Sequence, residues 1–375
     1  MVFRDDTSCP FFKGGSYLYK MKIIVAIDSF KGCLTSMEAN QAAADGIRKV
    51  LPDAEIIQVP VSDGGEGFLD AFRAAIGGIL VEVSVNDPLM RTITAKYLLK
   101  DDTAVIEIAQ ATGLTLLTKE ERNPMIATSY GTGQLVVDAV RKGAKHIIVG
   151  LGGSATSDCG MGMLKAIHEA QITMCNNIRF TIATDVRNPL YGPNGAAHVF
   201  APQKGATPED VLVLDEKARK FAEDSAKNLG FDRSQMEGAG AAGGLGYAFL
   251  QYLDADCKPG IQLLLESIKF KKQIQDADLI LTGEGSADHQ TLMGKLPMGI
   301  LLQSAGVPVC LIAGHISDQE ELLKAGFDHV ECINPDGISL EDAMQPKVAI
   351  QNISDTVSRY LSEVTILLQN VVFPV

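Results

Sequence analysis

The sequence predicts an α/β protein of two domains, in which a flavodoxin-like, doubly wound parallel sheet is interrupted by an inserted α/β domain with a mixed sheet. Strand–helix units occur at both ends of the chain, two before residue 80 and three after residue 277. Five such strands are what a flavodoxin-like sheet needs. Between them, polar and apolar residues alternate, as in antiparallel strands. The 375 residues are enough for two hydrophobic cores.

The segment 21–77 is expected to hold the first two strand–helix units. Its first strand, KIIVAI, is apolar on both faces, which is typical of a buried parallel strand. The expected elements are a strand at Lys22–Ile27, a helix from Thr35 or Ser36 to Val50, a strand at Glu55–Val59 and a helix ending near Ala75. A Thr or Ser before a helix, with Glu38 in its first turn, is a helix-start signal.

The inserted domain is expected over residues 78–276. Its strands are expected at Leu80–Val85, Thr92–Leu99, Thr103–Ile108, His146–Val149 and Phe180–Ala183. Its helices are expected from Thr128–Gly133 to Lys142, at Gly162–Ala170, at Pro208–Leu229, from Gly238–Gly246 to Leu253, and at Ile261–Ile274. The first three strands alternate in polarity and should pair as antiparallel neighbours.

Residues 277–375 are expected to return to the first domain. The expected elements are strands at Leu279–Leu281, Pro308–Ile312 and His329–Ile333, and helices at Met298–Ala305, Ser317–Ala325 and Asp342–Leu361. The first strand is expected to end in a glycine-rich loop that carries Glu284, Asp288 and Lys295. Ligands of open α/β sheets bind just beyond the carboxyl ends of the strands.

The composition narrows the class of protein. The net charge is −13 and no basic run occurs, so we expect no nucleic-acid partner. No apolar run has membrane-spanning length, and the seven cysteines are scattered without a CxxC pair, which favours reduced thiols and a cytoplasmic protein. Residues 1–20 lack the apolar core of a signal peptide, and we expect their deletion to leave activity and stability nearly unchanged.

Charged residues follow the ends of several expected strands. The acids are Asp28, Asp63, Glu66, Asp185, Glu284 and Asp288, and the cations are Lys31, Arg187 and Lys295. Carboxylates suit Mg²⁺, which prefers oxygen ligands, and the cations suit a carboxylate or a phosphate. Glycine-rich helix starts at Thr128–Gly133, Gly152–Asp158 and Ala239–Gly244 offer free N–H groups for anions. Each feature alone is also compatible with helix capping or a solvated surface, but together they favour an enzyme acting on small anions or phosphoryl groups.

Seven short stretches contain these residues. They are AIDSFKG (Ala26–Gly32), SDGGEG (Ser62–Gly67), TSYGTGQL (Thr128–Leu135), GLGGSATSDCGMGML (Gly150–Leu164), TDVRNPLYGPNGAA (Thr184–Ala197), GAGAAGGLG (Gly238–Gly246) and TGEGSADHQTLMGKLP (Thr282–Pro297). In this order they resemble the bacterial glycerate kinase family, over about residues 21–334. The chain departs from the family's pattern at Ser286, where an arginine is usual, and in the short segment Lys165–Phe180.

The resemblance implies a cytoplasmic kinase that uses ATP and Mg²⁺ to phosphorylate D-glycerate, with 2-phosphoglycerate favoured over 3-phosphoglycerate. On this interpretation the residues fall into four groups. Asp185, Asp63, Lys31 and Lys295 are candidate catalytic residues; Gly152, Gly153, Ser154, Thr156, Gly283 and Gly285 would bind ATP; Arg187, Ser29, Gly64 and Gly65 would bind glycerate; and Glu284 and Asp288 would bind Mg²⁺.

Two other functions stay open at this point. A regulator that binds a small metabolite without catalysis could use the same scaffold, although it would need fewer acids. A flavodoxin-like flavin protein could place a phosphate at AIDSFKGCLTS, but few aromatic residues are available to flank the flavin ring. ATP consumption with D-glycerate would exclude the regulator, and a visible absorbance spectrum would test for flavin. The sequence leaves homo-oligomerisation open.

Overall fold

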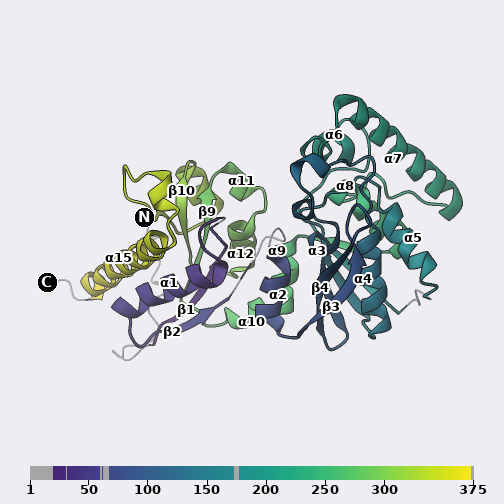
Figure 1. Ribbon diagram of the computed structural model, residues 1–375. Helices are drawn as coiled ribbons and strands as arrows, with labels where there is room; N and C mark the ends of the chain where they lie inside the picture. The colour runs from purple at the N-terminus through teal and green to yellow at the C-terminus, as the bar shows by residue number, and fades with distance from the viewer. Residues whose placement is uncertain (1–19, 31, 60, 62–66, 173–176, 373–375) are drawn as a thin grey trace. The chain divides into compact units, whose positions relative to one another are not determined.

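The computed structural model describes residues 20–30, 32–59, 61, 67–172 and 177–372 (Figure 1). The chain forms two compact units. One unit combines Met1–Asp63 with Leu264–Val375, and the other is Gly64–Leu263. The first unit is therefore discontinuous in sequence, and the second is inserted into it.

The first unit contains a five-stranded sheet in which every pair of neighbours is parallel. Its strands are β1 (Lys22–Ile27), β2 (Glu55–Gln58), β9 (Leu279–Ala287), β10 (Val309–Ile316) and β11 (His329–Cys332). Their order is β11-β10-β9-β1-β2, which is the flavodoxin-like order read from the opposite edge. The predicted fold class is thus confirmed, including the pairing of Ile23 on β1 with Leu279 on β9.

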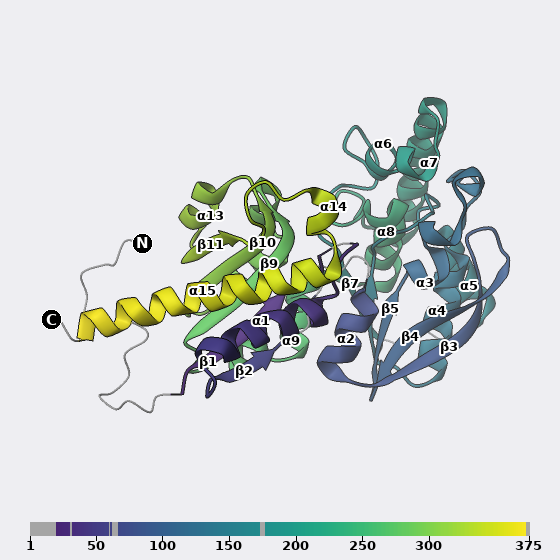
Figure 2. The same cartoon turned by 60° about the vertical axis from the view of Figure 1, so that its left-hand side comes forward.

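Helices α1 (Ser36–Val50) and α15 (Pro346–Val372) lie side by side against this sheet, as Figure 2 shows. Their apolar side chains share one hydrophobic cluster with alternate residues of β1, such as Ile23 and Val25. A Cβ added at Gly46 of α1 would lie 2.4 Å from the carbonyl oxygen of Ser354 on α15. Glycine at this position therefore allows the two helices to approach closely.

The remaining elements of the first unit are short helices. They are α10 (Phe270–Gln273), α11 (His289–Leu292), α12 (Leu296–Gln303), α13 (Gln319–Ala325) and α14 (Leu340–Ala343). The residues of β1 that alternate with the cluster above, Ile24 and Ala26, are also fully buried. Both faces of the sheet are therefore covered, as expected for a doubly wound fold.

Two polar side chains of α1 fix the carboxyl ends of β1 and β2. Asn40 is fully buried; its Oδ1 accepts from the N–H of Ile27 at 2.9 Å, and its Nδ2 donates to the carbonyl of Val59 at 3.0 Å. The hydroxyl of Ser36 donates to the carbonyl of Ile27 at 2.6 Å and accepts from the N–H of Val61 at 3.1 Å. These bonds hold the end of the sheet where ligands of such folds bind.

The second unit contains a six-stranded mixed sheet in the order β3-β4-β5-β6-β7-β8. The strands are β3 (Ile79–Asn86), β4 (Thr92–Lys100), β5 (Thr103–Glu107), β6 (His146–Gly150), β7 (Arg179–Ala183) and β8 (Asp256–Lys258). The first three are antiparallel neighbours, as predicted, and β5 to β8 are parallel. The short edge strand β8 was not predicted from the sequence.

Helices and short turns pack around this sheet. They are α2 (Phe68–Ile76), α3 (Ala109–Thr112), η1 (Leu114–Leu116), η2 (Lys119–Glu121), α4 (Tyr130–Arg141), α5 (Met161–Glu169), α6 (Ala196–Phe200), η3 (Pro202–Lys204), α7 (Pro208–Leu229) and α8 (Ala241–Leu253). A further helix, α9 (Gly260–Ser267), contains the boundary between the two units, which falls between Leu263 and Leu264. The core of the unit joins buried side chains of α4, α5 and α8 to the central strands.

Three expectations differ from the structure. The inserted segment was expected at 78–276, whereas the compact unit is Gly64–Leu263. Helix α2 belongs to this unit because the N–H of Leu69 donates to the carboxylate of Glu107 on β5 at 3.1 Å. The single helix expected at Ile261–Ile274 is two helices, α9 and α10, because Lys269 has a left-handed backbone (φ 54°). Strand β9 continues to Ala287, well past the expected end at Leu281.

No helix in the described part of the chain is long and apolar enough to cross a membrane. The expectation that residues 1–20 are dispensable concerns a segment of which the structure describes only Lys20.

Candidate functional site

The first unit places two acids at the carboxyl ends of neighbouring strands. Asp28 follows β1, its side chain is largely buried, and its N–H donates to the carbonyl of Gly283 on β9 at 2.9 Å. Glu284 is the next residue of β9 and is also buried. The chain leaves β1 toward β2 on one side, while β9 lies on the other side. Such a reversal of strand order is where ligands of doubly wound sheets bind.

Glu284 of β9 lies close to Asp288 and Lys295, which follow the strand. The Lys295 Nζ lies 3.4 Å from Glu284 Oε2 and 3.5 Å from Asp288 Oδ1. The hydroxyl of Thr291 donates to Glu284 Oε1 at 2.6 Å. Asp288 caps α11, where its Oδ1 accepts from the N–H of Gln290 at 2.8 Å. The capping bond and the Thr291 contact orient both carboxylates toward one ammonium group.

The electrostatics of this cluster are dominated by the burial of Glu284. Burial raises the pKa of its carboxyl group, and the Thr291 hydrogen bond and the Lys295 charge partly offset that effect. The side chain of Asp288 is one-third exposed and that of Lys295 is 30% exposed. The cluster is therefore buried on the strand side and open to solvent on the side of Asp288 and Lys295.

The donor set of this cluster fits Mg²⁺. Proteins usually hold Mg²⁺ through one or two carboxylates, with water and substrate phosphates completing the octahedron. Glu284 and Asp288 supply two carboxylates within reach of one cation. Among the described residues, no group of three or more His, Cys, Asp or Glu side chains forms a complete protein cage. The arrangement thus suits a metal shared with a ligand.

Two glycines expected in a phosphate loop lie in the strand instead. Gly283 pairs with Ile27 on one side and Ile312 on the other, and Gly285 also belongs to β9. A Cβ at Gly283 would lie 2.4 Å from the Ile312 carbonyl oxygen. The structure therefore accounts for Gly283 by the close approach of neighbouring strands. The expectation of a glycine-rich loop at Gly283 and Gly285 was wrong.

In the second unit, polar residues lie at and just after the carboxyl ends of the parallel strands. These ends are level, because Glu107 of β5 pairs with Gly150 of β6, and Gly150 pairs with Ala183 of β7. Glu107 is buried, and Asp185 and Arg187 follow β7 as exposed residues. Glu107 was not among the residues proposed from the sequence, although an acid that ends the apolar run TAVIE was a visible signal.

The starts of α4 and α5 were expected to bind a ligand anion, but a carboxylate of the protein, that of Asp158, accepts hydrogen bonds from their N–H groups instead. Asp158 accepts from the N–H of Ser129 at 2.8 Å, at the start of α4, and from the N–H of Gly162 at 3.1 Å, in the first turn of α5. Its carboxylate also accepts from the Ser129 hydroxyl at 2.9 Å and from the N–H of Gly160 at 3.1 Å. The prediction of free N–H groups at the start of α4 was therefore wrong, because a carboxylate of the chain already occupies that position.

The loop Gly152–Asp158 contacts a lysine that the sequence analysis missed. Lys204, in η3, is 2% exposed. Its Nζ donates to Ser154 Oγ at 2.8 Å and to the carbonyl of Thr156 at 2.6 Å. Burial lowers the pKa of Lys204 to about 7, against an opposing effect of Asp158. Within the short polar run PQKG it resembled an ordinary solvated lysine.

The other residues proposed from the sequence divide into two groups. Ser29 is half-buried beside Asp28, and its N–H donates to Asp28 Oδ1 at 2.7 Å. Lys31, Asp63, Gly64 and Gly65 lie outside the described residues, as does Glu66.

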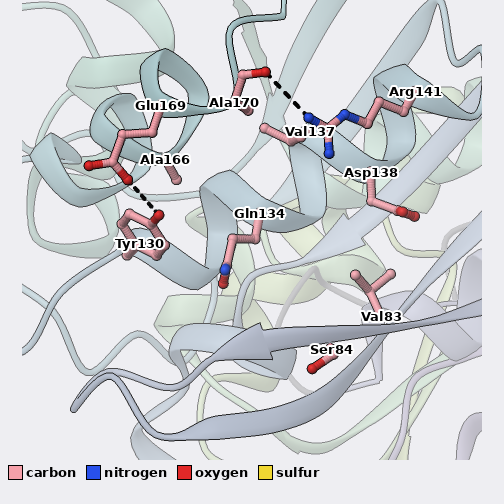
Figure 3. A pocket seen from close by; sticks show the side chains of 10 residues that line it. All are labelled: Val83, Ser84, Tyr130, Gln134, Val137, Asp138, Arg141, Ala166, Glu169 and Ala170. Atoms are coloured by element: carbon pink, nitrogen blue, oxygen red, sulfur yellow. Dashed lines mark hydrogen bonds between the residues drawn. The ribbon is translucent and has the colours of Figure 1, made fainter.

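A surface pocket of about 320 Å³ lies elsewhere on the second unit, between β3, α4 and α5 (Figure 3). Its polar side chains bond to nearby groups. The Tyr130 hydroxyl donates to Glu169 at 2.6 Å, and Arg141 donates to the carbonyl of Ala170 at 3.3 Å. Among the described residues, none of the acids, cations or glycines proposed from the sequence lines it, although Tyr130 belongs to the expected helix start Thr128–Gly133. We therefore place the candidate site at the sheet edges.

Comparison with known proteins identifies relatives over most of the chain. The model of the Glycerate kinase family matches residues 23–173 and 168–364. The glycerate kinase of Bacillus subtilis (strain 168) is 42% identical over 356 residues, which are 87% of this chain and 93% of that protein. The glycerate 2-kinase of Escherichia coli (strain K12) is 38% identical over 80% of this chain and 86% of its own.

A solved structure has the same fold. It is a crystal structure of a protein provisionally named glycerate kinase 2 from Salmonella typhimurium LT2, with a TM-score of 0.82 and 35% sequence identity. The match covers 94% of this chain and all of the other. With the family model, the relatives and the two-unit architecture in agreement, the chain belongs to the glycerate kinase family.

Proposed function

We propose that this protein transfers the γ-phosphoryl group of ATP to D-glycerate and that 2-phosphoglycerate is the product. Membership of the glycerate kinase family supports the reaction class, and the name of the Escherichia coli relative, glycerate 2-kinase, supports the choice of hydroxyl. The observation that carries the site assignment is the cluster of Glu284, Asp288 and Lys295 at the carboxyl end of β9.

Phosphoryl transfer depends mainly on positioning and on charge stabilisation. Glu284 and Asp288 would hold Mg²⁺, which when bound neutralises charge on the ATP phosphates. Lys295, held 3.4 Å from Glu284 Oε2, would place its ammonium group against a phosphate oxygen. Because Thr291 donates to Glu284 Oε1, the other carboxylate oxygen is the one that faces Lys295 and the ligand.

In the second unit we assign Asp185 to orient the reacting hydroxyl of glycerate and Arg187 to bind its carboxylate. Both side chains are exposed on the segment that follows β7. Asp63 and Lys31 are the alternative candidates for these two roles. Ser154 and Thr156, with Gly152 and Gly153, are assigned to ATP. A non-catalytic metabolite-binding regulator would share the fold but would not consume ATP.

Isosteric amide substitutions test this assignment. Glu284→Gln, Asp288→Asn and Asp185→Asn should each leave folding intact and lower kcat with D-glycerate by about a hundredfold or more. That loss corresponds to roughly 2.7–4 kcal/mol for one preorganised electrostatic group. Changing Glu284 or Asp288 should also raise the Mg²⁺ concentration needed for half-maximal rate, whereas changing Asp185 should not.

The measurement is steady-state ADP release across a Mg²⁺ titration, with a melting curve for each variant. Glu320→Gln is the matched control, because Glu320 is an exposed acid on α13 whose Oε2 lies 3.5 Å from the Lys324 ammonium group. Unchanged kcat in all three test variants at saturating Mg²⁺ would refute the site assignment. Absence of ATP consumption by the wild-type protein would refute the reaction, and NMR of the product would distinguish the two phosphoglycerates.

A further inference from the structure

Lys204 is buried, and its hydrogen-bond partners in the described part of the chain include no carboxylate. Its ammonium group donates to one hydroxyl and one carbonyl, both on the loop Gly152–Asp158. Removing a charged lysine from water is costly, and lysines are seldom fully buried unless paired. Hydrogen bonds to Ser154 and Thr156 account for two of its three donors. A lysine whose burial costs free energy is therefore hydrogen-bonded to this loop.

The same loop carries two buried hydroxyl groups that have no protein partner among the described residues. They are Thr156 Oγ1 and Ser157 Oγ. Thr156 is fully buried and Ser157 is 9% exposed. Buried polar atoms almost always have a hydrogen-bond partner, and those that lack one call for a ligand, ion or water. The loop reaches the surface three to five residues earlier, at the half-buried Gly152 and the exposed Gly153.

We propose that Lys204 is a positioning residue for a subsite in which the hydroxyls of Thr156 and Ser157 bind an anionic oxygen of a substrate. The proposal rests on the kinase function proposed above and adds Lys204 and Ser157 to its site. The ligand chemistry is that of an anionic oxygen. A phosphate oxygen of ATP agrees with the assignment of Thr156 above, and a carboxylate oxygen of D-glycerate would revise that assignment. Lys204 fixes the loop through its hydrogen bond to the Thr156 carbonyl, so that the hydroxyls of the same segment are held in place.

The variants Thr156→Val and Ser157→Ala distinguish a role of these hydroxyls in substrate binding from a role in protein stability. Each change removes a hydroxyl that has no partner in the described part of the chain, so stability should stay the same or rise slightly. The KM for one substrate should nevertheless rise about tenfold, which equals 1.4 kcal/mol of lost binding. A rise confined to D-glycerate identifies the carboxylate as the ligand, and a rise confined to ATP identifies a phosphate.

Lys204→Met tests the positioning role, with Lys220→Met as the control on the exposed surface of α7. Lys204→Met should raise the same KM that Thr156→Val raises, with a smaller change in kcat, and Lys220→Met should change neither. If Lys204→Met fails to fold, as its melting curve would show, the two hydroxyl variants decide the question.

A binding readout keeps this proposal separate from the proposed function. ATP and D-glycerate are added singly to wild type, Thr156→Val and Ser157→Ala, and the rise in melting temperature is measured. A ligand that binds only the folded state raises this temperature with its concentration. The subsite predicts that one of the two ligands protects the variants less than the wild type, even if the wild type shows no turnover. Equal protection by both ligands, together with KM values within twofold of wild type, would overturn it.

Discussion

Replacing Asn40 with alanine should strongly destabilise the first unit. The change leaves the N–H of Ile27 and the carbonyl of Val59 without their partner, in a position that is 0% exposed. Each buried group left unsatisfied costs about 1–3 kcal/mol, so the two together predict a loss of about 2–6 kcal/mol. For a unit of this size, each kcal/mol lowers the melting temperature by about 2–4 °C, and the midpoint should fall by at least about 4 °C.

The assay is urea unfolding followed by circular dichroism, with Gln41→Ala as the control. Gln41 is the next residue of α1, but it is exposed and bonds to Asp45 and Gln58 at the surface, so its loss should stay within about 0.5 kcal/mol. Because Asn40 also holds the ends of β1 and β2, kcat should fall in Asn40→Ala at temperatures where it is still folded. Equal unfolding midpoints for the two variants would refute the reasoning.

Three further predictions concern packing and pH. Gly46→Ala should destabilise by about 1–3 kcal/mol, the usual cost of overpacking, because its Cβ would lie 2.4 Å from the Ser354 carbonyl oxygen; a melting curve checks this, and an unchanged midpoint would contradict it. Since burial lowers the pKa of Lys204 from 10.5 to about 7, the unfolded state binds more protons between these pH values, and stability relative to Lys204→Met should rise across them in urea titrations. Burial raises the pKa of Glu284, so here the folded state binds more protons than the unfolded state. The stability of the wild type relative to Glu284→Gln should therefore fall as the pH rises from about 4, near the ordinary pKa of a glutamate. A stability difference that does not change with pH would argue against the raised pKa.

The parallel sheet was predicted well from the sequence because its strands can be recognised from their own residues. Lys22–Ile27 and Leu279–Leu281 are apolar on both faces, and only a central strand of a covered sheet buries both. Helix α1 was equally clear. Of the two expected caps, Thr35 or Ser36, the structure has Thr35, and the Glu38 carboxylate accepts from the Thr35 N–H at 2.9 Å in a capping box. These features depend on neighbours along the chain, which the sequence displays directly.

The errors arose where a residue's role depends on distant parts of the chain. Gly283 resembled a loop glycine, but it lies in β9 because the backbone of β10 leaves no room for a side chain. Asp158 resembled one more acid near a glycine-rich turn, yet it caps the start of α4, about thirty residues earlier in the chain. The burial of Lys204 depends on contacts with a loop about fifty residues away. Pairing of this kind leaves no local pattern in the sequence.

The pairing of β1 with β9 also has a consequence for the order in which the chain folds. Thr282 on β9 bonds to Ala26 on β1 across 256 residues of sequence. During synthesis β1 and β2 emerge first but lack the central neighbour β9 until most of the polypeptide has been made, whereas Gly64–Leu263 already contains all six strands of its own sheet. Since contacts distant in sequence form late and slowly, the inserted unit can fold on the ribosome while β1 and β2 still lack their neighbour β9. Those strands, rather than the inserted unit, are the part of the nascent chain most exposed to aggregation and to chaperone binding.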